Sequence, residues 1–275
     1  MKILVSGVRF PLWPPFFHNL AINFYKMKIL KPENSEEYIA KNPIVIVAFY
    51  NFCTIPNIEL FRDKTKNFCQ KNGILGTILL GNEGVNSTIA GTREAIDAFY
   101  EYTKQHEFFN GTVFKESYFT KIPFGKLKVK IRKEIVSIHE ECEFNPGTYI
   151  KPHDWDSFIQ QKDLILVDTR NDFEFCIGTF KGAINPHTTS FYEFRDWCLE
   201  NIPSKETPVA GFCTGGIRCE KSTSWLKKQG YTNVYHLEGG ILGYFMETKN
   251  QNKMWVGDCF VFDDRVIVDD QCIAN

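Results

Sequence analysis

The chain has 275 residues, of which 43% are hydrophobic and 24% are charged, and its formal net charge is -1. This length and composition are typical of a soluble globular protein with roughly two domains of ~100–150 residues each. The small net charge excludes a uniformly basic nucleic-acid-binding protein, so any contact with nucleic acid must come from a local patch.

Nine cysteines are scattered along the chain. An odd number without regular spacing argues against a disulfide framework and predicts a reducing, cytoplasmic compartment. The sequence has no apolar run of ~18 or more residues, so we expect no membrane-spanning segment. It also lacks metal-ligand spacings and dinucleotide-binding glycine motifs, so it predicts no metal site and no bound organic cofactor.

Residues 1–40 are expected to be an extension that precedes the first domain. The part up to residue 26 is apolar and aromatic, but three prolines interrupt it and it lacks a small-residue cleavage site, so it is a poor signal peptide. Met27-Lys28 repeats the first two residues of the chain. We therefore expect residues 1–26 to be either an extension of the gene model or a disordered tail.

Residues 41–145 are predicted to form a ferredoxin-like α+β domain. Short apolar runs rich in β-branched residues predict strands, and apolar residues every three to four positions predict helices. In chain order we expect a strand at 44–50, a helix at 58–71, strands at 74–80 and 85–90, a helix at 92–102 and a strand at 127–132. The order β-α-β-β-α-β is that of the ferredoxin-like, or acylphosphatase-like, arrangement.

Residues 152–250 are predicted to form a second domain, after a linker marked by Asn145-Pro146-Gly147. Strands are expected at 164–167, 209–212 and 234–237, and helices at 191–199, 219–229 and 241–248. Strands that alternate with helices predict a parallel sheet covered on both faces. Residues 251–275 form a C-terminal tail whose alternating apolar residues predict a hairpin that returns onto one of the domains.

The most informative motif is the stretch from Phe212 to Lys221. Cys213 follows an apolar strand, Gly215 and Gly216 form a tight turn, and a helical pattern begins near Arg218. Loop amides and a helix N-terminus direct positive charge at the sulfur, which lowers the pKa of the thiol and activates it as a nucleophile. We expect Cys213 and Arg218 to be catalytic. The alternative is a buried apolar cysteine beside a glycine turn.

The length of this loop bears on the chemistry. Cysteine phosphatases have one residue more between the thiolate and the arginine, because their loop surrounds a tetrahedral phosphate. A shorter loop suits a smaller group, such as a single sulfur atom carried on Cys213 as a persulfide.

Other polar residues are expected near the same edge of the sheet, because parallel-sheet sites lie at the carboxyl ends of strands. We expect Asp168 to accept hydrogen bonds from the cysteine loop, and Arg170 to pair with Glu174 or with a substrate anion. The alternative is a capping aspartate and a surface arginine. Cys219 is either a thiol that resolves an oxidised Cys213 as a disulfide or a structural cysteine.

Basic residues alternate with apolar ones near the end of the first domain. The basic residues are Lys126, Lys128, Lys130 and Arg132. On a strand they share one face at a spacing of ~7 Å, close to the phosphate repeat of an extended nucleic acid, while Leu127, Val129 and Ile131 face the core. Nearby aromatic residues favour RNA as the partner, since bases stack on aromatic rings. The alternative is an ordinary solvated edge.

Several motifs together resemble a known family. Asp168–Asp172, Gly178–Pro186, the cysteine loop and Glu238-Gly239-Gly240 resemble a rhodanese domain. More narrowly, Cys213–Lys221 resembles the signature of the bacterial rhodanese-containing tRNA uridine hydroxylases, the TrhO family. Motifs elsewhere that match the same family are Gly76–Leu80, Glu83–Asn86, Thr88–Gly91, Lys126–Lys130 and Phe260–Asp263.

The resemblance implies an oxidoreductase that hydroxylates the wobble uridine of tRNA at C5. It implies tRNA as the partner, molecular oxygen as the co-substrate and no further cofactor, and Cys213 matches the family's active-site cysteine. Neither a protein partner nor a membrane is expected. The alternatives are a sulfurtransferase that acts through a cysteine persulfide on thiosulfate-type donors, and an RNA-binding module with a silent rhodanese fold.

Overall fold

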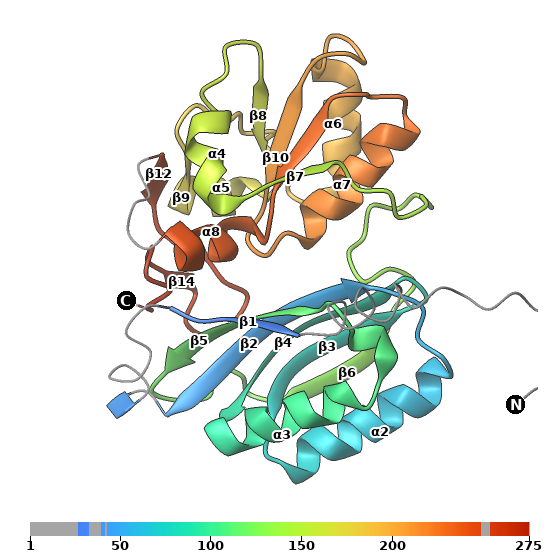
Figure 1. Ribbon diagram of the computed structural model, residues 1–275, viewed down its shortest axis with the longest axis vertical. Helices are drawn as coiled ribbons and strands as arrows, with labels where there is room; N and C mark the ends of the chain where they lie inside the picture. The colour runs from blue at the N-terminus through green and yellow to red at the C-terminus, as the bar shows by residue number, and fades with distance from the viewer. Residues whose placement is uncertain (1–26, 33–39, 42, 249–253, 275) are drawn as a thin grey trace, which may run out of the picture.

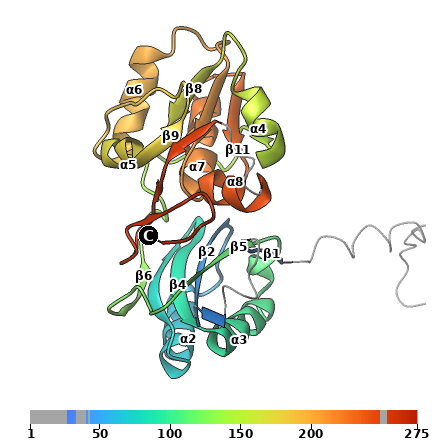
Figure 2. The same ribbon diagram turned by 90° about the vertical axis from the view of Figure 1, so that its left-hand side faces the viewer.

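The computed structural model describes residues 27–32, 40, 41, 43–248 and 254–274. These residues form two α/β domains stacked one above the other, and the end of the chain runs between them (Figures 1 and 2). Most of the predicted N-terminal extension, including residues 1–26, lies outside the described residues, but Lys28–Leu30 form a short strand.

The first domain is a six-stranded mixed sheet covered by two helices on one face. Its strands are β1 (Lys28–Leu30), β2 (Ile44–Phe52), β3 (Leu75–Gly81), β4 (Gly84–Thr92), β5 (Val113–Phe119) and β6 (Leu127–Ile131), in the order β1-β5-β2-β4-β3-β6. Helices α2 (Ile58–Lys71) and α3 (Arg93–Lys104) pack on the face turned away from the second domain (Figure 1). The opposite face of the sheet is therefore free to form an interface.

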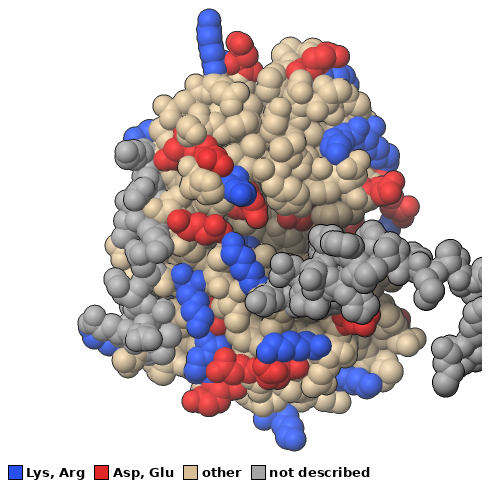
Figure 3. Space-filling model, in the orientation of Figure 1, with Lys and Arg blue, Asp and Glu red and all other residues tan. Residues whose placement is uncertain are grey.

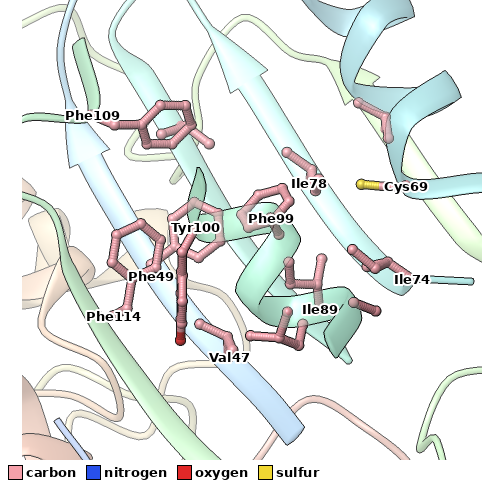
Figure 4. Close-up of a cluster of buried hydrophobic side chains, with 14 of the residues drawn as sticks. Val47, Phe49, Cys69, Ile74, Ile78, Ile89, Phe99, Tyr100, Phe109 and Phe114 are labelled. Carbon is pink, nitrogen blue, oxygen red and sulfur yellow. The ribbon is translucent and has the colours of Figure 1, made fainter. Parts of the chain in front are cut away.

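The helices form where the sequence gives them a capped end and an apolar face. The hydroxyl of Thr92 accepts a hydrogen bond from the amide of Ala95 at 3.3 Å and so caps α3. The apolar face of α3 meets the sheet in a core of aromatic and branched side chains (Figure 4). The Phe49 ring packs there against Phe99 and Phe114, with ring centroids 5.8 and 4.8 Å apart. Truncation of such a ring to alanine costs about 3–5 kcal/mol.

The ferredoxin-like prediction is confirmed, but the closing strand was assigned to the wrong segment. The order β5-β2-β4-β3 is the ferredoxin-like one, so β5 is the fourth strand of that fold. The predicted strand at 127–132 is β6, an added edge strand that runs parallel to β3. The residues of β5 escaped prediction because Lys115, Glu116 and Ser117 break the apolar pattern, yet all three are buried.

Glu116 is buried because its carboxylate is fully paired. It accepts hydrogen bonds from Arg93 at 2.9 Å, from the Tyr100 hydroxyl at 2.7 Å and from the Tyr118 hydroxyl at 2.8 Å. A buried charge is tolerated when partners replace its water in this way. A polar residue within a strand can thus belong to the core, which periodicity alone does not reveal.

The second domain has the predicted parallel sheet, in the order β7-β11-β10-β8 with every pair parallel. Its elements are β7 (Thr148–Ile150), α4 (Pro152–Phe158), β8 (Ile165–Asp168), α5 (Asp172–Ile177), β9 (Gly178–Phe180), η3 (Phe191–Glu193), α6 (Phe194–Asn201), β10 (Val209–Phe212), α7 (Ile217–Lys228), β11 (Val234–Leu237) and α8 (Gly240–Thr248). In the described ranges, no helix is both long enough and apolar enough to cross a membrane.

The C-terminal tail lies between the two domains (Figure 2). Strand β12 (Trp255–Gly257) pairs with β9, and β13 (Cys259–Phe260) and β14 (Ile267–Val268) form a small antiparallel hairpin. A hairpin was expected on one domain, but this one contacts both. Arg265 donates a 2.7 Å hydrogen bond to Ser117 of the first domain, and the Phe260 ring lies 4.9 Å from that of Phe173 in the second.

Candidate active site

Cys213 lies where β10 ends and the loop into α7 begins. All four residues of β10 are buried, so the strand fixes the position of the loop within the domain core. Gly216 has φ of 103°, a conformation that glycine adopts readily, and it directs the chain into the helix. The Gly216 amide donates a 3.1 Å hydrogen bond to the Cys213 sulfur. The loop therefore curls around the sulfur, as its sequence predicted.

The surroundings of Cys213 favour the thiolate. Burial alone would raise the pKa of the thiol, but it is outweighed by a hydrogen bond from the Cys219 thiol, the charge of Arg218 and hydrogen bonds from the amides of Cys219 and Gly216. Together these lower the pKa of Cys213 to about 6. A large fraction of the sulfur is then ionised at neutral pH, which is what a nucleophile requires.

Arg218 is held by an ion pair rather than lying free in the loop. Its Nη1 and Nη2 atoms each donate a 2.8 Å hydrogen bond to a carboxylate oxygen of Glu174, which is fully buried. This bidentate pair fixes the plane of the guanidinium group. Arg218 also lies over the Phe262 ring, 5.8 Å from its centroid. Glu174 is thus the residue that orients Arg218, and the sequence had assigned it to Arg170.

The predictions for Asp168 and Arg170 are wrong in their contacts. Arg170 pairs with Asp168 instead, through hydrogen bonds of 2.9 and 2.6 Å, and both side chains are fully buried. No hydrogen bond joins the Asp168 carboxylate to the cysteine loop within the described residues. Arg170 is inaccessible to a substrate anion because it is packed against the rings of Phe212 and Trp255. The pair stabilises the sheet edge below the site.

Cys219 lies within hydrogen-bonding reach of Cys213, on the first turn of α7. Its own pKa is raised because it is fully buried and next to a thiolate. The Thr169 hydroxyl lies 3.5 Å from its sulfur. In this state the neutral Cys219 thiol donates a hydrogen bond that stabilises the Cys213 thiolate, whether or not Cys219 also forms a disulfide.

The Cys213 side chain is only 1% exposed, yet it lines a cavity of about 410 Å³ between the two domains. The floor of this cavity is the open face of the first sheet, its roof is the cysteine loop, and the C-terminal tail closes one side. Lining residues outside the loop include Tyr50, Thr77, Leu79, Lys115, Phe124, Phe262, Arg265 and Cys272. A small planar group fits a space of this size and character.

The predicted basic residues border the same face of the sheet. Lys128 and Lys130 are exposed and pair in register with Thr77 and Leu79, which line the cavity. Residues in register on neighbouring strands point to the same side. Lys126 and Arg132 continue this basic stripe and are exposed, whereas Ile131, expected in the core, is 37% exposed. On the face drawn in Figure 3, by contrast, basic and acidic side chains are intermingled.

Three residues of the site were not predicted from the sequence. Tyr50 and Lys115 come from the first domain, and Glu220 from α7. The Tyr50 hydroxyl donates a 2.7 Å hydrogen bond to Glu220, and the Lys115 ammonium donates one of 3.1 Å to the Gly215 carbonyl oxygen. The only local signal for Lys115 was a run of polar residues inside an otherwise apolar segment. In the described part of the chain, no cluster of histidine, cysteine and acidic residues could hold a metal ion.

Comparison with known proteins agrees with this architecture. Residues 44–135 match the UPF0176 acylphosphatase-like domain, and residues 151–247 match the rhodanese-like domain. Among solved structures, the chain is similar to a rhodanese-like domain from Anabaena sp., with 16% identity, a TM-score of 0.34, and coverage of 41% of this chain and 80% of that one. It is also similar to a rhodanese-like domain protein from Staphylococcus aureus, with 22% identity, a TM-score of 0.30, and coverage of 35% and 90%. A thiosulfate sulfurtransferase from Pseudomonas aeruginosa matches with 21% identity, a TM-score of 0.31, and coverage of 35% and 18%.

The family whose N-terminal domain matches is the one that the sequence resembles, and the order of the two domains is the same. The chain belongs to the TrhO/UPF0176 family, whose architecture is an acylphosphatase-like domain followed by a rhodanese-like domain.

Proposed function

We propose that this protein is a tRNA-modifying oxidoreductase that hydroxylates C5 of the wobble uridine, with Cys213 as the nucleophile. The observation that carries the proposal is the position of the sulfur. Its thiolate lines a cavity between the domains, and the floor of that cavity continues into an exposed basic stripe. A base that leaves the anticodon stack would enter the cavity while the neighbouring phosphates remain near the stripe.

The chemistry follows from the thiolate. Uridine C5 is a poor site for direct oxidation by a protein without a redox cofactor. Addition of the Cys213 thiolate to C6 turns C5 into an enolate-like carbon nucleophile, which can react with an oxygen-derived oxidant. Loss of the C5 proton then restores the C5–C6 double bond, breaks the bond between sulfur and C6, and releases the thiolate. In the net reaction one atom of dioxygen is added at C5, and a two-electron reductant reduces the other atom to water. Loop amides and the helix N-terminus would stabilise the charge on sulfur in the free enzyme.

The stripe supports RNA as the substrate. Lys128 and Lys130 lie on the edge strand β6, and the exposed residues Lys126 and Arg132 directly flank it, so a phosphate backbone can lie along the four. Phe124 and Phe262 line the cavity and offer rings for base stacking. A protein that acted only on a small sulfur compound would have no use for these features.

The test is mass spectrometry of nucleosides from unmodified tRNA incubated with the purified protein, air and a thiol reductant. We expect 5-hydroxyuridine from the wild-type protein and none from Cys213→Ala. Cys176→Ala is the matched control, since Cys176 is an exposed thiol outside the cavity. The same amount of 5-hydroxyuridine from wild type and Cys213→Ala would remove Cys213 from the mechanism.

A sulfurtransferase that acts through a persulfide on Cys213 is the second candidate. The rhodanese-like match and the lowered pKa of the Cys213 thiol support it. In this reaction the thiolate takes the outer sulfur of thiosulfate, releases sulfite and passes the sulfur to an acceptor thiol. Rapid thiosulfate turnover by a protein that leaves tRNA unchanged would favour this function over hydroxylation.

A further inference from the structure

Lys115 is a buried lysine that the first domain inserts into the site of the second. It lies on β5 and is 4% exposed. Its side-chain methylenes pass two glycines of the second domain: a Cβ atom added to Gly239 would lie 3.6 Å from Lys115 Cε, and one added to Gly243 would lie 3.8 Å from it. The second domain thus presents a surface without side chains where the lysine passes. This arrangement positions the ammonium group beside the cysteine loop.

The Lys115 ammonium has fewer partners than a structural lysine needs. Among the described residues its only hydrogen-bond acceptor is the Gly215 carbonyl oxygen at 3.1 Å, and no carboxylate lies within 4.0 Å of it. Lys221 is equally buried in the same interface, but it forms ion pairs with Glu83 and Glu134. The Lys115 ammonium also lies 5.4 Å from the centroid of the Tyr50 ring. A buried ammonium group without a carboxylate in direct contact is costly, so the fold gains little stability from keeping it there.

Lys115 also faces the cavity that contains the nucleophile. Its side chain and Cys213 line the same 410 Å³ space. Two of its three N–H donors have no protein acceptor in the described residues, so they are available to a bound group. A pyrimidine that presents C6 to the sulfur has its carbonyl oxygens within the same small volume.

A second cavity of about 280 Å³ meets the first at Tyr50 and Lys115, which line both. This second cavity is also lined by Glu220, whose carboxylate accepts hydrogen bonds from the hydroxyls of Tyr50 and Tyr149. Its wall includes the acidic residues Glu238 and Glu247. Solvent on that side can exchange protons with Glu220, which lines the second cavity and not the first.

We propose that Lys115 is a catalytic acid of this site and that Glu220, held by Tyr50, returns its proton from the second cavity. The inference rests on the proposed function and assigns one step of it. The Cys213 thiolate pair forms the bond to C6, and the π pair of the C5–C6 double bond moves onto C5 and O4 as an enolate. Lys115 donates an Nζ proton to the enolate oxygen and becomes a neutral amine, and Glu220 restores that proton.

The charges around Lys115 support this role. Burial lowers the pKa of Lys115 to about 8, although nearby anions oppose the shift. Burial raises the pKa of Glu220 to about 7, against the hydrogen bond from Tyr50 and the charge of Lys115. Groups that titrate close to neutral pH transfer protons most efficiently there. The ionisable groups that act on Lys115 are Glu220 on α7, Cys213 in the loop, Glu247 on α8 and Lys28 on β1.

The experiment is single-turnover formation of 5-hydroxyuridine in an anticodon stem–loop RNA, measured against pH with the full-length chain. Variants are Lys115→Met, Lys115→Arg and Lys115→Ala, with Lys221→Met as the matched interface control. We expect Lys115→Met to lose about 100-fold or more in rate. Its affinity for the RNA should stay within about threefold, since the lysine acts on the base and not on phosphate.

Three results separate catalysis from structure. Lys115→Arg should keep the affinity for RNA but lose most of the rate, because a guanidinium group stays protonated and cannot donate its proton. Ethylamine should restore turnover to Lys115→Ala, and Lys221→Met should lose thermal stability more than activity. If Lys115→Met does not fold, Lys115→Arg and Lys115→Ala still test the role of Lys115.

A Lys115→Met protein with the wild-type rate and pH profile would overturn this inference and leave the proposed function unchanged. Equal losses in Lys115→Met and Lys221→Met, without rescue by ethylamine, would overturn it too. If the wild-type protein makes no 5-hydroxyuridine, the proposed function fails first, and the two failures are thereby distinguished.

Discussion

The hydroxyl of Tyr50 in the first domain donates a 2.7 Å hydrogen bond to the carboxylate of Glu220, on the helix that follows the cysteine loop of the second. The same hydroxyl lies so close to the loop that a Cβ atom at Gly216 would come within 2.6 Å of it. The first domain therefore touches the loop that holds Cys213. The site is shared by both domains, so the acylphosphatase-like domain forms part of its wall.

The ionisation of Cys213 gives the first prediction. The rate of alkylation by iodoacetamide should rise with pH and reach half its maximum near pH 6, because loop hydrogen bonds and Arg218 lower the pKa of the thiol to about 6. Replacing Arg218 with methionine should move this midpoint up by about one unit or more, since each unit corresponds to ~1.4 kcal/mol of lost charge stabilisation. The measurement is mass spectrometry of the Cys213 peptide in a Cys176→Ala background. A midpoint near 9 in the wild type would contradict the thiolate assignment.

The loop glycines give a matched pair of substitutions. Gly216→Ala should destabilise the protein and abolish activity, because this residue has φ of 103° and its new Cβ would collide with Tyr50. A change at a strained and packed position costs roughly 1–3 kcal/mol. Gly215→Ala should be tolerated, since no atom lies within 4 Å of a Cβ there. Thermal unfolding and the 5-hydroxyuridine assay check both. Similar behaviour of the two variants would mean that the loop relaxes more than its packing implies.

The basic stripe predicts how RNA affinity depends on salt. Reversing the charge with Lys128→Glu and Lys130→Glu should weaken binding of an anticodon stem–loop about tenfold or more. It should also lower the slope of the logarithm of affinity against the logarithm of salt concentration by ~1–2. Lys64→Glu and Lys66→Glu form the control, because these exposed lysines lie on α2, behind the other face of the sheet. Fluorescence anisotropy at several salt concentrations measures both. Equal effects of the two pairs would indicate a diffuse electrostatic attraction instead of a defined track.

Glu220 should make the stability of the fold depend on pH. Its folded-state pKa of about 7 lies above the usual value of 4.5, so the folded protein favours the protonated carboxyl. The contribution of the protonated carboxyl to the free energy of unfolding is fully present below about pH 4.5 and is lost as the pH rises through 7. Glu220→Gln should therefore gain stability relative to wild type between these limits, by up to about 3 kcal/mol. Urea unfolding at both ends of this range measures the difference, and exposed Glu101→Gln is the control. A constant difference would show that Glu220 titrates alike in the folded and unfolded states, against the raised pKa.

Sequence patterns were sufficient wherever the relevant contacts are local. The alternation of strands and helices in the second domain predicted its parallel sheet, and the spacing from Cys213 to Arg218 predicted the loop around the sulfur. Both depend on residues a few positions apart. The basic stripe was visible for the same reason, because alternation along a single strand is read directly from the sequence.

Contacts between distant residues were not predictable in this way. The sequence analysis paired Arg170 with Glu174 or with a substrate anion, and only the folded geometry paired Arg170 with Asp168 and Arg218 with Glu174. Strand β5 was missed because its polar residues are satisfied by partners elsewhere in the chain.

The amino-acid sequence by itself determined the two kinds of domain, the family and the position of the cysteine loop, since these depend on short-range periodicity and on one compact motif. Tertiary structure alone decided that Lys115 reaches Gly215, 100 positions away, and that Tyr50 reaches Glu220, 170 positions away. The physical reason is that burial of a polar side chain depends on which distant groups replace its water, and no local pattern in the chain records that choice.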